Sequence, residues 1–534
     1  MDKEYSKQNN IIWNLAVRDD NFVAKQISKN KQIDGIYSLK EAGLLDEFFQ
    51  FLTEAGMIEL IKGVKYKNVK REMVEFYRYI FLYIFKSIMG IRSMNSLPNL
   101  LFSNTAAMGL VGFNAYQVKN GICNRGDFKR KKKEKSGPIC PWTVSNNIVK
   151  IPANEVENLL NQAISKIAQM LLLPKAINTI LDTTDLETTE KFKGCGSVTR
   201  EKKIKDKNGK EQEVEITVYG FKLLVLYCFS NKIPIAAKLI KINESGSDYT
   251  GAIMEQAKKN LGENCKIKCV AMDKEFLDGE ELWKLNEKGI YFIVPAKRNM
   301  DVFIDAKAIA LDEKITGKEK IVVSREIEVS VGKGKNNRKE KRETVLVGIS
   351  GLNTYDEYGP AGHCKNRYKK SFKPNRINGI VIKKWDGKDF EGKGGPVYIT
   401  NLSINNPFRG FDYYDERSCI ENSMFREGKQ KWYLKRPGKR TEVGMTVHIF
   451  LTLFVLALTS AYWKWKEKKE GKKNELGIER WRAELQKENQ EKVIVFFKKK
   501  YGIFYNYEVI ILLGAKVKDF DEKTIFSKYN IRAP

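Results

Sequence analysis

The chain lacks the usual patterns of a zinc protein and of a secreted protein. It has only two histidines, His363 and His448, and its eight cysteines include no C-x-x-C pair. Cys265 and Cys269 are the nearest pair, and scattered thiols of this kind are typical of reduced cytosolic proteins. The first residues, MDKEYSKQNNIIWN, contain no apolar run of the kind found in a secretory signal. We therefore expect a cytoplasmic protein that associates with the nucleoid.

Acidic residues are scarce relative to basic ones. The 534 residues include 95 Lys and Arg against 66 Asp and Glu, which gives a formal net charge of +29. A charge of this sign and size favours a polyanionic partner, either nucleic acid or an anionic membrane surface. The length suggests several domains, each able to bury its own core.

One segment has the length of a membrane span. Residues 443–462, VGMTVHIFLTLFVLALTSAY, are close to the ~20 residues that cross a bilayer. Polar residues such as Thr446, His448 and Thr459 recur through it, and the mean hydropathy of the chain is −0.44. We interpret the segment as a buried core helix and expect no membrane partner, which leaves double-stranded DNA as the leading partner.

The hydrophobic pattern changes along the chain. Amphipathic runs before residue 120 predict helices with no competing strands, and a basic block at 129–135 predicts an exposed linker. From residue 176 the pattern predicts three strands and then alternating helices and strands, with a hairpin turn at Asn208-Gly209. This order is that of a ribonuclease-H-like α/β sheet. The runs between 301 and 400 predict further strands in a β-rich insertion.

These patterns divide the chain into six predicted segments. They are a helical N-terminal region (1–125), a basic linker (126–150), the first part of the core (151–300), the β-rich insertion (301–400), the second part of the core (401–465) and a C-terminal region (466–534).

Three acidic residues are candidates for one catalytic site. Asp182 and Asp273 each follow an apolar strand, and ligand sites in open α/β sheets form at the carboxyl ends of strands. Glu421 lies in YDERSCIEN, where Tyr414, Arg417 and Glu421 share one face if the segment is helical. Carboxylates from separate segments can hold Mg²⁺, and two such ions suit phosphodiester cleavage. Taken alone, Arg417 and Glu421 also fit an ordinary solvated ion pair.

The sequence resembles the DDE transposases of bacterial insertion sequences, in particular the insertion-sequence-four group. Tyr414, Arg417 and Glu421 match the first three positions of its signature, Y-x2-R-x3-E-x6-K, and the aspartates in LDTTD and VAMDKEF match its first two acids. Asp182 is preferred to Asp185, and Asp273 to Glu275. The resemblance covers about 175–465. It implies catalysis by Asp182, Asp273 and Glu421, which would hold two Mg²⁺ ions that Mn²⁺ can replace.

The sequence departs from this signature at the lysine. Gly428 occupies the expected position and Lys429 follows it, with Arg426 and Lys431 as rivals. One extra residue turns an α-helix by about 100°.

Further DNA contacts follow from the resemblance and from the charges. Arg417 and Tyr414 would hold a DNA phosphate, and Trp385 would stack on a displaced base. The strand ends suggest further phosphate contacts, for which the candidates are Lys222, Lys297 and Arg298.

By this resemblance, the function expected is a transposase whose helical N-terminal region, 1–125, is a DNA-end-binding region that binds the terminal inverted repeats of its element. It would cleave both ends as a homodimer on DNA and join the 3′ hydroxyls to target DNA. The alternatives are a ribonuclease-H-like nuclease, a DNA-binding protein descended from a transposase that has lost catalysis, and a basic membrane-associated protein.

Overall fold

The chain divides into two compact units in its computed structural model. The central unit comprises Ile167–Lys429, and the terminal unit combines Met1–Lys166 with Gln430–Pro534. The structure describes residues 15–39, 43–67, 74–122, 137–205, 211–331, 338–352, 377–390, 395–418, 420–471, 478–485, 491–516 and 522–532. The predicted basic block at 129–135 and the predicted turn at Asn208-Gly209 lie outside these residues.

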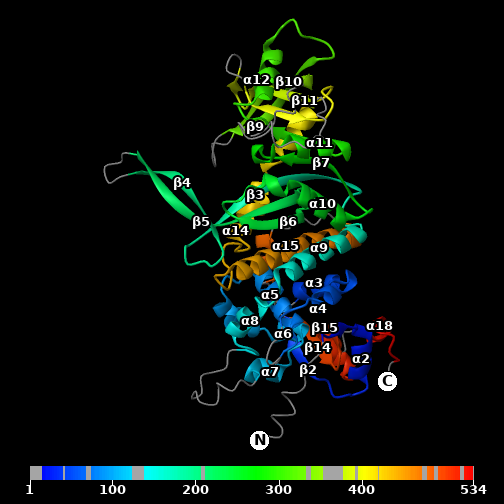
Figure 1. The fold of residues 1–534 in the computed structure, drawn as a ribbon. Helices are drawn as coiled ribbons and strands as arrows, with labels where there is room; N and C mark the ends of the chain where they lie inside the picture. Colours follow the sequence, from blue (N-terminus) through cyan, green and yellow to red (C-terminus); the bar gives the residue numbers. More distant parts are fainter. Residues whose placement is uncertain are drawn as a thin grey trace. The chain divides into compact units, whose positions relative to one another are not determined.

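A large mixed sheet forms the core of the central unit (Figure 1). Its first elements are β3 (Ala176–Thr188), β4 (Gly196–Lys205), β5 (Glu211–Cys228), β6 (Ile233–Lys241), α10 (Thr250–Leu261), β7 (Lys266–Met272), α11 (Gly279–Glu287) and β8 (Tyr291–Pro295). Strands β3, β5 and β6 pair antiparallel, and β7 runs parallel to both β3 and β8. The three predicted strands correspond to β3, β5 and β6, and the alternation of helices and strands after them is confirmed, whereas β4, which pairs with β5, was not predicted.

The segment between 301 and 400 is rich in strands, as predicted. It contains α12 (Asp301–Leu311), β9 (Lys320–Val331), β10 (Arg338–Leu352), β11 (Ile377–Trp385), β12 (Lys388–Asp389) and β13 (Val397–Thr400). Strand β13 pairs with β8, so these strands continue the main sheet instead of forming a second one. Figure 1 shows β4 and the start of β5 extending as a ribbon from the rest of this sheet.

Helix α13 (Pro407–Asp415) is held tightly against the inserted strands. A Cβ at Gly410 would come within 2.6 Å of Ile380 Cδ1 on β11, so a larger residue would require the Ile380 side chain to shift. Arg325 of β9 donates two hydrogen bonds to the Asp412 carboxylate, at 3.0 and 2.6 Å. The insertion therefore fixes the helix that leads into the YDERSCIEN segment. The π-helix η10 (Ile420–Arg426) and α14 (Glu427–Gln430) follow.

The terminal unit is mainly helical. Its helices are α2 (Asp20–Ser28), α3 (Gly43–Glu54), α4 (Met57–Lys62), α5 (Tyr77–Ile88), η2 (Met94–Ser96), η3 (Pro98–Phe102), α6 (Thr105–Val111), α7 (Ala115–Asn120), α8 (Pro141–Ile148), most of α9 (Ala153–Gln169), α15 (Glu442–Glu470), α16 (Ile478–Leu485), α17 (Asn506–Leu512) and α18 (Glu522–Lys528).

The expectation that the N-terminal region contains no strands is wrong. Short strands β1 (Val17–Arg18) and β2 (Gly35–Ser38) pair with β15 (Lys500–Tyr505) and β14 (Lys492–Phe497). The two ends of the chain thus share one four-stranded sheet. Two-residue and four-residue strands carry too little pattern to be recognised without their partners.

Helix α15 contains the apolar segment at 443–462. It is long and apolar enough to cross a membrane, but 89% of its most apolar window is buried inside the protein. Within the terminal unit it packs against α3 and α5. The segment therefore forms a core helix in this structure, as interpreted from the sequence.

Candidate active site

The first two predicted acids lie side by side at one edge of the central sheet. Strands β3 and β7 pair with Leu181 opposite Met272, so the next residues, Asp182 and Asp273, are neighbours where β7 ends. Asp182 is only 5% exposed. Asp273 is half-buried, and its Oδ1 accepts a hydrogen bond of 2.8 Å from the backbone N–H of Lys274.

The YDERSCIEN segment is not one continuous α-helix, contrary to the sequence expectation. Helix α13 ends at Asp415, and tighter turns follow in which Arg417 N–H donates to the Tyr414 carbonyl at 2.9 Å. Glu421 then lies in the π-helix η10. The three side chains nevertheless remain together, because the turns keep Arg417 between the other two.

Arg417 connects the first and third predicted acids. Its Nη1 lies 2.9 Å from Asp182 Oδ2 and 3.1 Å from Glu421 Oε1. Burial raises the pKa of Asp182 to about 6, Arg417 opposes this, and the neighbouring carboxylates Asp273 and Glu421 add to the increase. Glu421 itself is 57% exposed at its side chain. The site thus has a buried carboxylate on the sheet and a solvent-facing one on the helix.

Tyr414 lies beside Arg417. Its ring packs against Tyr398 of β13 with centroids 4.4 Å apart and the ring planes tilted by 38°, and the Arg417 guanidinium lies 5.5 Å from its centre. Burial raises the pKa of Tyr414 to about 12; Arg417 lowers it, and Asp273 raises it. Tyr414 therefore contributes a neutral hydroxyl close to the carboxylates.

Lys429 reaches the same face of strand β3 as Asp182. Its Nζ donates a hydrogen bond to Thr184 Oγ1, and Thr184 is two residues from Asp182 and therefore on the same side of the strand. The π-helix explains how the extra residue before Lys429 is tolerated. A π turn closes from residue i to i+5, so it takes up one more residue than an α turn.

The rejected acids, Asp185 and Glu275, have other partners. Asp185 pairs with Arg200 of β4, and Glu275 accepts hydrogen bonds from Thr183 Oγ1 at 3.0 Å and from Lys222 Nζ at 3.2 Å. Lys222 lies opposite Asp185 in the sheet, on the face away from Asp182. The structure therefore does not bring Lys222 to the carboxylate group.

The other predicted DNA contacts lie at two places in the central unit. Lys297 and Arg298 follow β8, the strand next to β7, after one intervening residue, Ala296, at the same edge of the sheet as Asp273. Trp385 ends β11, and its ring meets Phe411 of α13 edge-on at 5.9 Å.

Two contributors to the site, Thr184 and Tyr398, were missed at the sequence level. The alternation of side chains along β3 could have indicated Thr184, since it is two residues from Asp182. Nothing in the sequence near Tyr398 indicates that its ring packs against Tyr414.

The donor set of the site suits a hard divalent cation, because Asp182, Asp273 and Glu421 offer only carboxylate oxygens. In their present arrangement, no three Asp, Glu, His or Cys side chains among the described residues are close enough together to hold a metal ion. The Arg417 guanidinium is the cation found between Asp182 and Glu421.

A mixed α/β domain with acids at adjacent strand ends is compatible with phosphoryl transfer on nucleic acid, and comparison with known families identifies the class. The family model for the transposase DDE domain matches residues 174–458, just over half of the chain. The chain belongs to this family of DDE transposases.

Other comparisons add little to this assignment. The chain is similar to a cryo-EM structure of the piggyBac transposase synaptic complex with hairpin DNA, at 10% sequence identity and a TM-score of 0.36. That similarity covers 90% of this chain and 80% of the other, and it is too weak to support an inference. No curated protein matches the sequence.

The Arg417–Asp182 contact predicts a coupled effect on stability. Replacing Arg417 with Ala leaves a buried carboxylate without its cation, so the free energy of unfolding should fall by about 3 kcal/mol. In an Asp182→Asn background the same replacement should cost at least about 1 kcal/mol less. Urea denaturation of the two single variants and the double variant measures this coupling.

A matched control uses the neighbouring ion pair on the same strand. Arg200→Ala removes the partner of Asp185, which is 27% exposed at its side chain, and should cost under about 1 kcal/mol. Equal losses for Arg417→Ala in both backgrounds would show that the contact with Asp182 contributes nothing.

Proposed function

We propose that this transposase binds the terminal inverted repeats of an insertion sequence, cleaves the phosphodiester bond at each end and joins the 3′ hydroxyls to target DNA. The observation that carries the proposal is the meeting of Asp182, Asp273 and Glu421 around Arg417, on a chain of the DDE family.

We assign the core to the ribonuclease-H-like fold. The strand order β6-β5-β3-β7-β8 supports this, since three antiparallel strands are followed by two parallel strands reached through helices. We assign the chain to the insertion-sequence-four group on Tyr414, Arg417 and Glu421, and on the β-rich insertion that precedes them.

Asp182, Asp273 and Glu421 would hold Mg²⁺, or Mn²⁺ in its place. A pair of such ions would supply charge stabilisation to the attacking and leaving oxygens of the phosphodiester. The polar side chains beside the acids would have a separate role, which is to hold the DNA. Arg417 has a planar fork of donors suited to a DNA phosphate, and Tyr414 adds a hydroxyl donor beside it.

We assign the signature lysine to Lys429 instead of Arg426 or Lys431. Its contact with Thr184 and the π turn between Glu421 and Lys429 support this choice. Lys297 and Arg298 are proposed as further phosphate contacts at the same sheet edge, and Trp385 as a stacking surface for a displaced base. Lys222 is left out because it pairs with Glu275.

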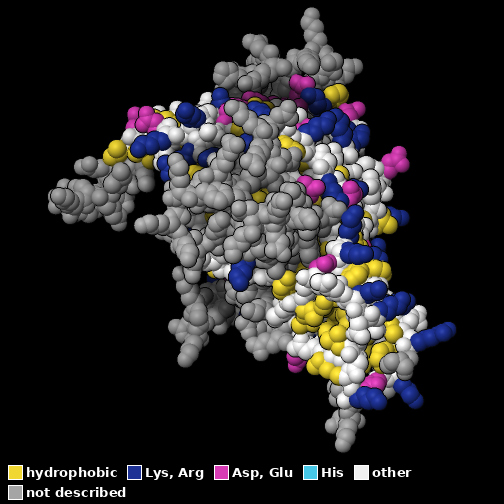
Figure 2. Space-filling view, turned by 90° about the horizontal axis from the view of Figure 1, so that it is seen from below, with side chains coloured by type: hydrophobic (Ala, Val, Ile, Leu, Met, Phe, Trp, Pro, Cys, Tyr) yellow, Lys and Arg dark blue, Asp and Glu magenta, His cyan; other side chains and the backbone are white. Residues whose placement is uncertain are grey.

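The N-terminal region is proposed to recognise the element ends, and the active complex is proposed to be a homodimer on DNA. Lysine and arginine side chains are spread over much of the described surface in Figure 2, in keeping with the net charge of +29. We keep the cytoplasm as the expected compartment and propose no membrane partner.

A second candidate is a DNA-binding protein that has lost catalysis. It is favoured by the position of Arg417, whose guanidinium lies between two of the carboxylates that would hold metal. Cleavage assays separate the two functions, and strand-transfer assays separate a transposase from a simple nuclease.

Substitution of the three acids tests catalysis directly. Asp182→Asn, Asp273→Asn and Glu421→Gln should each reduce Mg²⁺-dependent cleavage of end DNA at least about 1,000-fold, because each removes a metal ligand. Binding of the same DNA should be largely unchanged, since no basic contact is lost. Asp185→Asn is the matched control, on the same strand but the opposite face, and it should cleave normally. An acid variant with full cleavage is not part of the site.

Lys429→Ala tests the assignment of the lysine. Loss of one phosphate donor should reduce the cleavage rate about 100-fold. Lys431→Ala, which removes a lysine only two residues away, should have little effect. If Lys431→Ala is the more damaging change, the signature lysine has been assigned wrongly.

Assembly is tested by light scattering with and without end DNA. Free monomers of charge +29 should repel one another, whereas DNA supplies the counter-charge. We expect a monomer alone and a dimer with two DNA ends. A stable dimer without DNA would contradict the repulsion argument, and strand transfer by one protein on one end would contradict the paired-end mechanism.

A further inference from the structure

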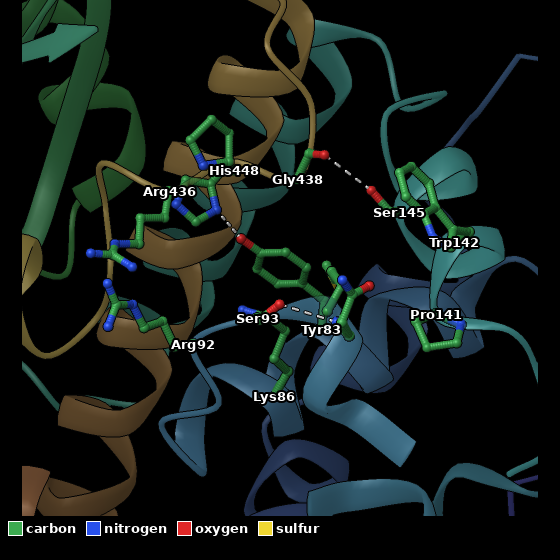
Figure 3. A pocket seen from close by; sticks show the side chains of 13 residues that line it. Tyr83, Lys86, Arg92, Ser93, Pro141, Trp142, Ser145, Arg436, Gly438 and His448 are labelled. Carbon is green, nitrogen blue, oxygen red and sulfur yellow. Dashed lines mark hydrogen bonds between the residues drawn. The ribbon is translucent and has the colours of Figure 1, made fainter. Parts of the chain in front are cut away.

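The terminal unit contains a cavity of about 350 Å³ whose walls are basic (Figure 3). It is lined by Lys86 near the end of α5, by Arg92 in the following segment, by Trp142 at the start of α8, and by Arg436 and His448. Its volume lies in the range of small-ligand sites. No aspartate or glutamate is among the described residues that line it.

Three cations face this cavity without a counter-ion. Lys86, Arg92 and Arg436 form no side-chain hydrogen bond or ion pair with any residue that the structure describes. The Lys86 Nζ lies over the ring of Tyr83, 5.5 Å from the ring centre. Lys86 is only 5% exposed. A buried charge is costly unless it is paired, so the cavity is suited to receive an anion.

The surrounding groups cannot neutralise Lys86. Burial lowers the pKa of His448 to about 4, so this ring is neutral; its Nε2 donates to the Tyr433 carbonyl at 2.9 Å, and its Nδ1 accepts from the Tyr83 hydroxyl. Arg482 is a further cation nearby. Burial first, and then Arg482, lower the pKa of Lys86 to about 8. The neighbours of Lys86 are therefore neutral or positive.

The opposite side of the cavity has an aromatic surface. Trp142 is 61% exposed, unusual for so large an apolar side chain, and Lys439 lies over its ring at 5.0 Å. In Figure 3 the guanidinium groups of Arg92 and Arg436 lie on one side of the cavity and Trp142 on the other. The cavity therefore combines two features that bind a nucleotide: basic side chains can hold its phosphate, and an exposed indole can stack on its base.

We propose that this cavity binds a phosphate group of a DNA strand between Lys86, Arg92 and Arg436, with Trp142 contacting the adjacent nucleotide. The choice of DNA as the source of the phosphate rests on the proposed function. A free nucleotide or inorganic phosphate has the same chemistry, so the experiments distinguish these sources.

The first experiment measures phosphate binding without DNA. Thermal unfolding of the full chain is followed in sodium phosphate and in sodium chloride of equal ionic strength. Phosphate at about ten times its Kd should raise the midpoint by about 2–4 °C. Arg92→Ala/Arg436→Ala should abolish this increase and should still fold, because both side chains are exposed.

The matched control removes two charges from the same segment outside the cavity. Lys435→Ala/Arg440→Ala should keep the full increase, because neither residue lines the cavity. An equal increase in the cavity variant and the control variant would overturn the proposal.

The pH dependence gives a second readout. Bound phosphate favours protonated Lys86, so the phosphate effect should be present below pH 8 and weaken as the pH rises above it. The other charged groups here are Arg92 and Arg436 at the cavity and Arg482 beside Lys86, and His448 stays neutral over this range. In Lys86→Met this dependence should disappear. The same dependence in Lys86→Met would contradict the role given to this lysine.

The third experiment identifies the source of the phosphate. Binding of a 30-base-pair duplex of arbitrary sequence is measured in EDTA over a range of salt concentrations. Relative to Lys435→Ala/Arg440→Ala, the cavity variant should bind at least about tenfold more weakly, with a salt slope lower by about one to two. Equal DNA binding, with the phosphate effect lost, would reject DNA and assign the cavity to a free anion.

These measurements involve neither metal nor cleavage. Failure of the three acid substitutions to block cleavage would remove the proposed catalytic function and leave the cavity result intact. Conversely, a cavity that binds neither phosphate nor DNA would leave the proposed catalytic function unaffected.

Discussion

Parallel pairing of β3 with β7 is the constraint on which the candidate site depends. It places Asp182 next to Asp273 although 90 residues separate them in the chain, because Leu181 and Met272 are fixed opposite each other. The residues just before this point, Ile180-Leu181 in β3 and Val270 to Met272 in β7, are apolar and buried, so the register is set by burial and resists slippage. A shift of one residue in β3 alone would turn the Asp182 carboxylate to the other face, where Thr183 and Asp185 make their contacts.

The third acid depends on a different part of the fold. Glu421 follows α13, and α13 is held by the inserted strands through the close contact at Gly410 and the hydrogen bonds of Arg325. The inserted strands therefore hold α13, and with it the segment that carries Glu421, in place within the central unit. Arg417 completes the arrangement, because its guanidinium compensates the charge of the buried Asp182 and also contacts Glu421.

The sequence predicted the strands of the central unit well because each is an apolar run between turn residues. It also predicted that Asp182, Asp273 and Glu421 lie near one another, since two follow such runs and the third lies in a recognisable motif; their catalytic role stays a prediction. The end of α13 at Asp415 was not predictable from the sequence. The spacing of three and four residues from Tyr414 to Glu421 fits a continuous α-helix as well as it fits the observed turns and π-helix. The partners of β1 and β2 were hidden for another reason: they lie more than 450 residues away, and local patterns carry no information about them.

The candidate active site and the cavity of the terminal unit have opposite charge imbalances. In the central unit three carboxylates are gathered around one arginine, so the site has an excess of negative charge that suits added cations. In the cavity of the terminal unit three cations are gathered with no carboxylate among the described lining residues, so it suits an added anion. A buried charge without a full counter-charge lowers the stability of the free protein, and this applies to Asp182 in the first site and to Lys86 in the second. A ligand of opposite charge would remove that cost at each site, which is the common physical basis of the proposed metal site and of the proposed anion cavity.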